Sequence, residues 1–126
     1  MDKESLYKQL ENAVIRYEPG ADKKMLSKVK KQCIYDEVCV PNLNYDLLHD
    51  KLLLIGTILE EDENSSTYIA VIKAGVNNIN PCIMAVNLAD TKLTVCAFAR
   101  EGIIKQNTSN KAIEKLKNTL SINNEN

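Results

Sequence analysis

The chain has 126 residues, of which 44% are hydrophobic and 26% charged, and its 16 basic and 17 acidic side chains leave a formal net charge of −1. This length predicts one domain with a core large enough to need no disulfide or metal. The near-zero charge argues against nucleic acid as a partner. No run of about 18 apolar residues occurs, so no membrane-spanning helix is expected. Residues 1–8 alternate in charge and lack an apolar segment, which predicts a cytoplasmic protein without a signal peptide.

The numbers of particular residue types further limit which ligands the protein is expected to recognise. Lysine outnumbers arginine 14 to 2 and asparagine occurs 14 times, a bias typical of AT-rich coding sequences that indicates a bacterial source. Two arginines and no tryptophan leave little capacity for bidentate phosphate recognition or base stacking. The four cysteines are expected to be free thiols in a reducing compartment. Cys82 and Cys96 lie within apolar runs, so burial is expected for both.

Two helices are predicted at the N-terminal end. Residues 3–17 carry apolar side chains at helical spacing, with Asp2 as the N-cap and Pro19 just beyond the end. A second helix is predicted over 22–34, with an apolar stripe on one side. Five lysines occupy the rest of its surface: Lys23, Lys24, Lys28, Lys30 and Lys31.

The remainder of the chain predicts a four-stranded antiparallel meander followed by an amphipathic helix. Ahead of the meander, 38–40 predicts a short edge strand, and Asn44 is expected to cap a single helical turn over 45–48. The strands are predicted over 51–59, 67–74, 82–88 and 92–99. The last helix begins near Thr108 and buries Ala112, Ile113, Leu116 and Leu120. The fold class is therefore α+β, with a single domain over 1–120 and a frayed polar tail over 121–126.

The strands are apolar on both faces. In 67–74, Tyr68, Ala70 and Ile72 lie opposite Ile69 and Val71. Leaving such side chains in water costs several kcal/mol at about 25 cal/mol per Å², which is comparable to the whole stability of a domain. Both faces therefore need cover. The N-terminal helices and the C-terminal helix can supply it, or a second copy can cover what remains, which makes a homodimer a reasonable expectation.

Cys33, Cys39 and His49 are the candidate residues for metal or thiol chemistry. Zinc prefers thiolate and imidazole ligands, but paired zinc-binding cysteines commonly have two to four residues between them. Cys33 and Cys39 have five between them, and no second close pair follows. Acidic side chains that could complete such a site are Asp36, Glu37, Asp46 and Asp50. A reactive cysteine would have to use His49, the one histidine, as its base. The favoured interpretation is that these three residues are structural, with no metal and no catalytic role.

Two charged clusters are further candidates for a functional site. Glu60, Glu61, Asp62 and Glu63 could provide paired carboxylates for acid–base work, but a hairpin tip is expected to keep them solvated. The five lysines over 23–31 could bind a polyanion or an acidic partner, although a solvated helix face is favoured. The acidic loop is a complementary patch through which copies of the chain could associate.

No catalytic or cofactor-binding motif can be written from this sequence. The four glycines are scattered singly, so no phosphate-binding loop is present and no cofactor is expected. The sequence favours a non-enzymatic module that binds itself or another protein. Two alternatives stay open: a thiol- or metal-dependent site at Cys33, Cys39 and His49, or an apolar pocket on the sheet that holds a small ligand.

Overall fold

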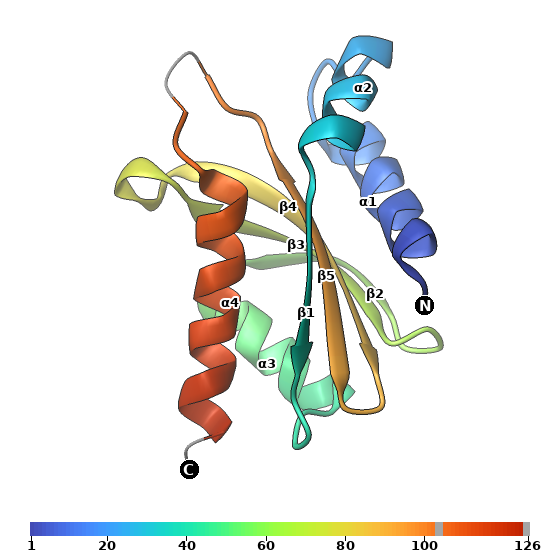
Figure 1. The fold of residues 1–126 in the computed structure, drawn as a ribbon, viewed down its shortest axis with the longest axis vertical. Helices are drawn as coiled ribbons and strands as arrows, with labels where there is room; N and C mark the ends of the chain where they lie inside the picture. The colour runs from blue at the N-terminus through green and yellow to red at the C-terminus, as the bar shows by residue number, and fades with distance from the viewer. Residues whose placement is uncertain (103–104, 125–126) are drawn as a thin grey trace.

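The computed structural model describes residues 1–102 and 105–124 of the chain. Within these residues, four α-helices and one five-stranded antiparallel sheet form three layers, with the sheet in the middle (Figure 1). The predicted α+β class is confirmed. In chain order the elements are α1 (Lys3–Tyr17), α2 (Lys23–Gln32), β1 (Ile34–Cys39), α3 (Tyr45–Ile55), β2 (Thr57–Asp62), β3 (Thr67–Ala74), the short 3-10 helix η1 (Val76–Asn78), β4 (Asn80–Ala89), β5 (Lys92–Ala99) and α4 (Thr108–Asn124).

The two predicted N-terminal helices are confirmed, and side-chain caps set where they begin. The Asp2 carboxylate accepts a hydrogen bond from the Ser5 N–H at 2.7 Å, and the Asp22 carboxylate accepts one from the Met25 N–H at 2.9 Å. These bonds satisfy N–H groups that the first turn of a helix leaves without partners. α1 ends two residues before Pro19, as predicted.

The sheet has five strands in the order β1-β5-β4-β3-β2, where four were predicted. The additional strand is β1, which begins at Ile34, although the sequence predicts helix up to that residue and only a short strand over 38–40. β1 pairs with β5 from Ile34 opposite Ala97 to Cys39 opposite Lys92. Because this partner strand lies almost sixty residues further along the chain, local sequence patterns give little indication of the pairing.

The strand predicted over 51–59 is wrong over residues 51–55 and is confirmed only from Thr57 onward. Residues 51–55 continue α3, and β2 begins only at Thr57. Asn44 caps α3 as predicted, since its side-chain oxygen accepts a hydrogen bond from the Leu47 N–H at 2.8 Å. The helix nevertheless runs for 11 residues rather than one turn.

Burial of the leucines in α3 follows the helical period. Leu48 and Leu52 are one turn apart, and both are fully buried, whereas Leu54 is 72% exposed. A strand would place Leu52 and Leu54 on the same face. A continuous aliphatic run is compatible with either structure, and here the packing of Leu48 and Leu52 into the core against the sheet accompanies the helix.

Helices of the same chain cover both faces of the sheet (Figure 1). Tyr68, Ala70 and Ile72 pack in the core beneath α3 and α4, whereas Ile69 and Phe98 pack in the core beneath α1 and α2. The predicted two-sided burial is therefore confirmed. Because intramolecular helices provide the cover, the sheet faces themselves give no reason for a second copy.

The C-terminal helix extends beyond the point where a frayed tail was predicted. α4 buries Ala112, Ile113, Leu116 and Leu120, as expected, and continues to Asn124. Residues 125–126 of the predicted tail lie outside the described residues. None of the helices in the described part of the chain is both long and apolar enough to cross a membrane.

Candidate functional site

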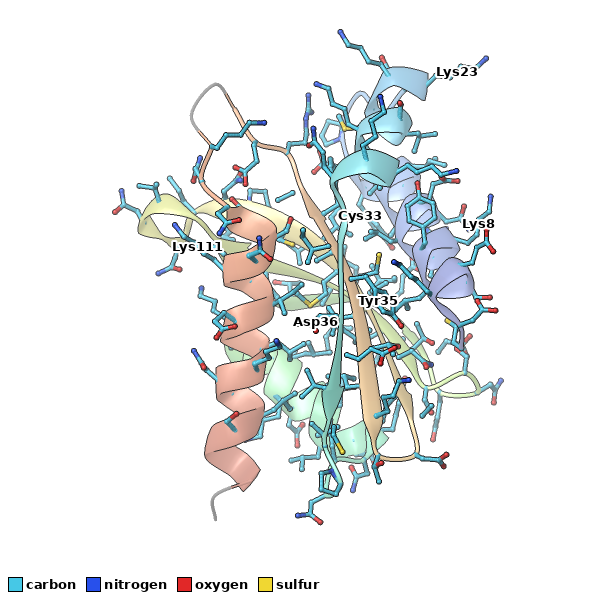
Figure 2. The ribbon with its side chains drawn as sticks, viewed as in Figure 1. Lys8, Lys23, Cys33, Tyr35, Asp36 and Lys111 are labelled. Atoms are coloured by element: carbon cyan, nitrogen blue, oxygen red, sulfur yellow. The ribbon has the colours of Figure 1, made fainter. Side chains whose placement is uncertain are left out.

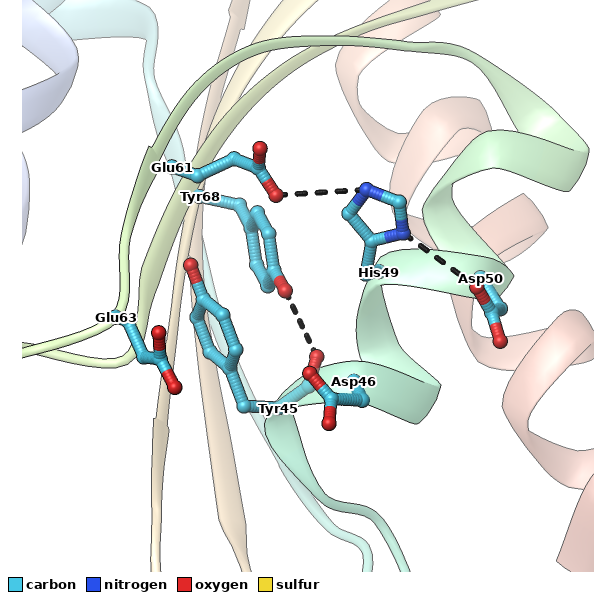
Figure 3. Close-up of a pocket in the computed structure, with 7 residues that line it drawn as sticks. All are labelled: Tyr45, Asp46, His49, Asp50, Glu61, Glu63 and Tyr68. Carbon is cyan, nitrogen blue, oxygen red and sulfur yellow. Dashed lines mark hydrogen bonds and ion pairs between the residues drawn. The ribbon is translucent and has the colours of Figure 1, made fainter.

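An open pocket of about 500 Å³ lies between α3 and the β2–β3 hairpin (Figure 3). It combines four carboxylates, two tyrosine rings and the single histidine of the chain. The lining residues are Tyr45, Asp46, His49, Asp50, Glu61, Glu63 and Tyr68. This concentration of negative charge around aromatic rings makes the pocket the strongest candidate site.

One wall of the pocket comes from the first turns of α3. Tyr45, Asp46, His49 and Asp50 are spaced i, i+1, i+4 and i+5, which places them on one side of a helix. Leu48 and Leu52, on the adjacent side of the helix, are buried in the core, and Tyr45 packs against the same core. The amphipathic pattern of α3 therefore leaves Asp46, His49 and Asp50 outside the core, beside β2.

A β-bulge determines on which face of the sheet each carboxylate of β2 lies. Ile58 pairs with Ala70 and Glu60 pairs with Ile69, so Leu59 is an extra residue on the β2 side. The extra residue reverses the alternation of faces that follows it. Glu61 consequently lies opposite Tyr68, on the α3 face of the sheet, while Glu60 lies on the α1 face.

Glu60 is held away from the pocket by residues of α1. Its carboxylate accepts hydrogen bonds from Arg16 Nε at 2.6 Å, from a terminal guanidinium nitrogen of Arg16 at 2.8 Å and from the Tyr17 hydroxyl at 2.8 Å. Partial burial raises the pKa of Glu60, but these hydrogen bonds outweigh it and leave the pKa below its usual value. Glu61, Asp62 and Glu63 are exposed, as predicted for a solvated tip, whereas Glu60 is half-buried on the α1 face of the sheet.

Two stacked tyrosine rings form the aromatic part of the pocket. The ring centroids of Tyr45 and Tyr68 are 4.5 Å apart and the planes are inclined by 15°. The Tyr68 hydroxyl donates to the Tyr45 backbone oxygen at 2.8 Å, which ties β3 to the start of α3. Burial raises the pKa of both phenols, and the carboxylate of Glu61 raises both further. Both rings are neutral at pH 7. Tyr68 is fully buried, so the half-buried Tyr45 ring is the aromatic surface that a ligand can reach.

Both ring nitrogens of His49 face carboxylates. Nε2 lies 3.4 Å from Glu61 Oε1, and Nδ1 lies 3.4 Å from Asp50 Oδ1 (Figure 3). A general base needs a nitrogen directed at the substrate, and a nucleophilic mechanism needs a serine or cysteine within reach of that base. The lining residues include no serine, threonine or cysteine. The arrangement places four carboxylates around a space in which a positive charge would be stabilised.

The structure does not bring together Cys33, Cys39 and His49. Cys33 precedes β1 and Cys39 ends it, which places them roughly 20 Å apart at 3.3 Å per residue. His49 contacts Glu61 of β2, at the opposite edge of the sheet from β1. Across the described residues, no group of three or more histidine, cysteine, aspartate or glutamate side chains is placed to hold a metal ion.

The five lysines over 23–31 are all exposed on α2. Among the residues that the structure describes, none of them forms an ion pair with a carboxylate. They do not point to one common site. Lys30 lines a cleft beside β1, whereas Lys28 lines a smaller pocket with Arg100 and Lys105.

Thiol labelling is expected to separate the cysteines into two classes. Cys39 is exposed and Cys33 is half-buried, while Cys82 and Cys96 are buried as predicted. Burial raises the pKa of each buried thiol to about 12, which suppresses the reactive thiolate. Mass spectrometry after brief maleimide treatment at pH 7 should show at most two adducts on native protein and four in denaturant. Rapid native addition of a third adduct would contradict this assignment.

The sequence pattern grouped His49 with Asp46 and Asp50, and Glu61 with Glu63, but did not bring the two groups together. It missed Tyr45 and Tyr68 altogether as site residues. The useful signal was the spacing of polar residues over 45–50, which becomes visible once α3 is extended past one turn.

Comparison with protein-family models, with curated proteins and with solved structures finds no significant match to this chain. Function is therefore inferred from the geometry and chemistry of the chain itself.

Proposed function

We propose that the chain is a non-enzymatic protein-interaction module whose acidic pocket receives a basic side chain of a partner protein. A lysine ammonium or an arginine guanidinium can interact with both the carboxylates and the aromatic part of the pocket. Carboxylates bind either group by charge-assisted hydrogen bonds, and the face of a tyrosine ring attracts a cation through its quadrupole. The volume of about 500 Å³ accommodates the end of one such side chain together with the peptide around it.

One observation carries this proposal. Within the described chain, none of the four pocket carboxylates pairs with a lysine or an arginine. By contrast, Glu60 on the other face of the same strand has a bidentate arginine partner. Like charges held close together are unfavourable unless a cation offsets them. His49 is the one group in the pocket that can supply a positive charge, and it does so only when protonated.

The partner we propose is another protein rather than a second copy. The sequence favours a homodimer because a second copy could cover an apolar sheet face. In the structure, helices of the same chain cover both faces: α1 and α2 on one, α3 and α4 on the other. The exposed lysines of α2 could still reach the pocket of another copy. Such a contact joins two different surfaces of the two copies, so it is heterologous. Repeated contacts of this kind produce an open filament unless the rotation between successive copies closes a ring. Light scattering at several protein concentrations distinguishes these outcomes, because a monomer at all concentrations supports a different protein as partner.

Reversing one charge in the pocket is expected to weaken binding of a basic peptide. The probe is a pentapeptide with one arginine flanked by glycine and serine, and its titration is followed by NMR chemical shifts of the labelled protein. Shifts should be confined to α3 and the β2–β3 hairpin. Glu63→Lys should raise the dissociation constant about tenfold, because it replaces an attractive charge in the pocket lining by a repulsive one.

Glu114→Lys is the matched control. Glu114 is exposed on α4 and does not line the pocket, so the same change in net charge should alter the dissociation constant by less than about twofold. A peptide with glutamine in place of arginine should produce no saturable shifts. Equal effects of the two substitutions, or equal binding of the two peptides, would show that the pocket does not recognise a basic side chain.

A further inference from the structure

The outer edge of β1 is open for pairing. β1 lies at one edge of the sheet and pairs with β5 on one side, and Figure 2 views the molecule with this edge toward the reader, between α4 and α1. The Val40 N–H donates to the Thr91 oxygen at 2.6 Å, which fixes the alternation of the antiparallel ladder. Residues an even number of positions from Val40 therefore bond to β5. Tyr35, Glu37 and Cys39 direct their N–H and C=O groups outward.

Part of this edge is already occupied by the chain itself. The Glu37 N–H donates to the Asp36 carboxylate at 2.8 Å, and Asp36 in turn pairs with Lys117 of α4. Glu37 also pairs with Lys92. These contacts engage the middle of β1, so the backbone at Tyr35 is the part of the edge best placed to accept another strand.

A cleft lies beside the edge at this same point. It measures about 670 Å³ and is bounded by α1, the end of α2 and the first residues of β1. Its largely apolar wall includes Tyr7, Cys33, Tyr35 and the buried Cys96. Three exposed charged side chains also line it: Glu4, Lys30 of α2, and Lys3, whose Nζ lies 5.0 Å from the centroid of the Tyr35 ring. The two lysines outnumber the single carboxylate.

We propose that this edge and cleft bind an extended acidic segment of a partner protein, which adds to the sheet as a sixth strand beside Tyr35. Main-chain hydrogen bonds supply affinity in such strand addition, and pockets for alternate side chains supply specificity. Here one apolar side chain enters the cleft, and an adjacent carboxylate lies near Lys3 and Lys30. The surface is independent of the acidic pocket, which lies at the β2 edge.

The charges on β1 disfavour a second copy as the occupant. Antiparallel pairing of two β1 strands over most of their length places either Glu37 opposite Glu37 or Asp36 opposite Asp36 of the other copy, depending on the register. Like charges directly across a strand pair are destabilising. An acidic side chain at the edge is also a common means by which proteins prevent pairing of identical strands. The two lysines beside the cleft instead complement an acidic segment.

The test uses two synthetic heptapeptides that alternate valine and threonine and end in either two glutamates or two lysines. NMR titration of the full chain with the acidic peptide should shift signals of β1 and of the cleft and slow hydrogen exchange at the Tyr35 amide. The acidic peptide should bind at least about fivefold more tightly than the basic one. Absence of saturable shifts in β1, or equal affinity for both peptides, would overturn the proposal.

Two pairs of variants make the test specific. Lys30→Glu should weaken binding of the acidic peptide at least about fivefold. Lys31→Glu is the control, because it makes the same charge change on the same helix and Lys31 does not line the cleft. It should alter binding less than about twofold. Tyr35→Pro removes the outward N–H at an edge position that tolerates proline and should abolish binding, while Tyr35→Phe should retain it. Equal effects of Lys30→Glu and Lys31→Glu would overturn the proposal, as would dimerisation of the chain through β1.

Discussion

Replacing Leu52 by alanine is expected to lower the free energy of unfolding by about 2 to 5 kcal/mol, the range measured for leucine truncation in well-packed cores. Leu52 is fully buried in the core between α3 and the sheet. Truncation removes its contacts and leaves a cavity that the surrounding helices and strands can fill only in part. Urea unfolding followed by far-UV circular dichroism measures the loss, provided that the slope with denaturant stays unchanged.

Leu54→Ala is the matched control, since it makes the same chemical change two residues away. Leu54 is 72% exposed, so the substitution should change the free energy of unfolding by no more than about 0.5 kcal/mol. The pair also tests the secondary structure of 51–55. In a strand the two leucines would share a face and their truncations would have similar costs. Similar losses for both variants would contradict the helix.

Gly56→Ala is expected to cost about 1 to 3 kcal/mol, the usual penalty for forcing an atom into a packed site. Gly56 joins α3 to β2, where the backbones of β2 and β3 approach closely. A Cβ at this position would lie 3.0 Å from a side-chain carbon of Ile72 and closer still to the backbone oxygen of Val71. That oxygen belongs to a paired strand, so relief of the overlap requires displacement of β2. The same urea titration measures the effect.

The effect of Gly56→Ala should extend to the acidic pocket. Displacement of β2 moves Glu61 relative to His49, so NMR signals of both residues should shift in the variant. Gly102→Ala is the control. A Cβ there meets no atom within 4 Å, and the only expected effect is a slight stabilisation through reduced entropy of the unfolded chain. A Gly56→Ala protein as stable as the parent would show that the close approach of the strands is absent.

Much of the framework could be predicted from local sequence. The caps at Asp2, Asp22 and Asn44 are short-range signals, because a side chain bonds to a backbone N–H three residues away. β3, β4 and β5 were recognisable because apolar, β-branched residues are separated by turn residues. The candidate site was predicted only in fragments. Its residues come from α3, β2 and β3, and their proximity depends on how α3 packs on the sheet.

The composition of 16 basic and 17 acidic residues gave no indication of where charge would matter. In the structure, four carboxylates gather in a pocket at the β2 edge, while two exposed lysines and one glutamate line the cleft at the β1 edge. These opposite characters at the two edges of one sheet underlie both proposed binding surfaces. Net charge sums over the whole surface, whereas recognition depends on charges within about one Debye length of a ligand.

The sequence by itself determined the α+β class, the N-terminal caps and the need to cover both faces of the sheet. Each of these follows from short-range hydrogen bonding or from the alternation of apolar side chains. The tertiary structure decided that residues 51–55 are helical and that a bulge at Leu59 places Glu61 on the α3 face and Glu60 on the α1 face. A leucine-rich run fits a buried helix or a buried strand equally well, and a bulge is defined by the register with a partner strand. Both outcomes therefore depend on packing against distant residues, which local sequence does not encode.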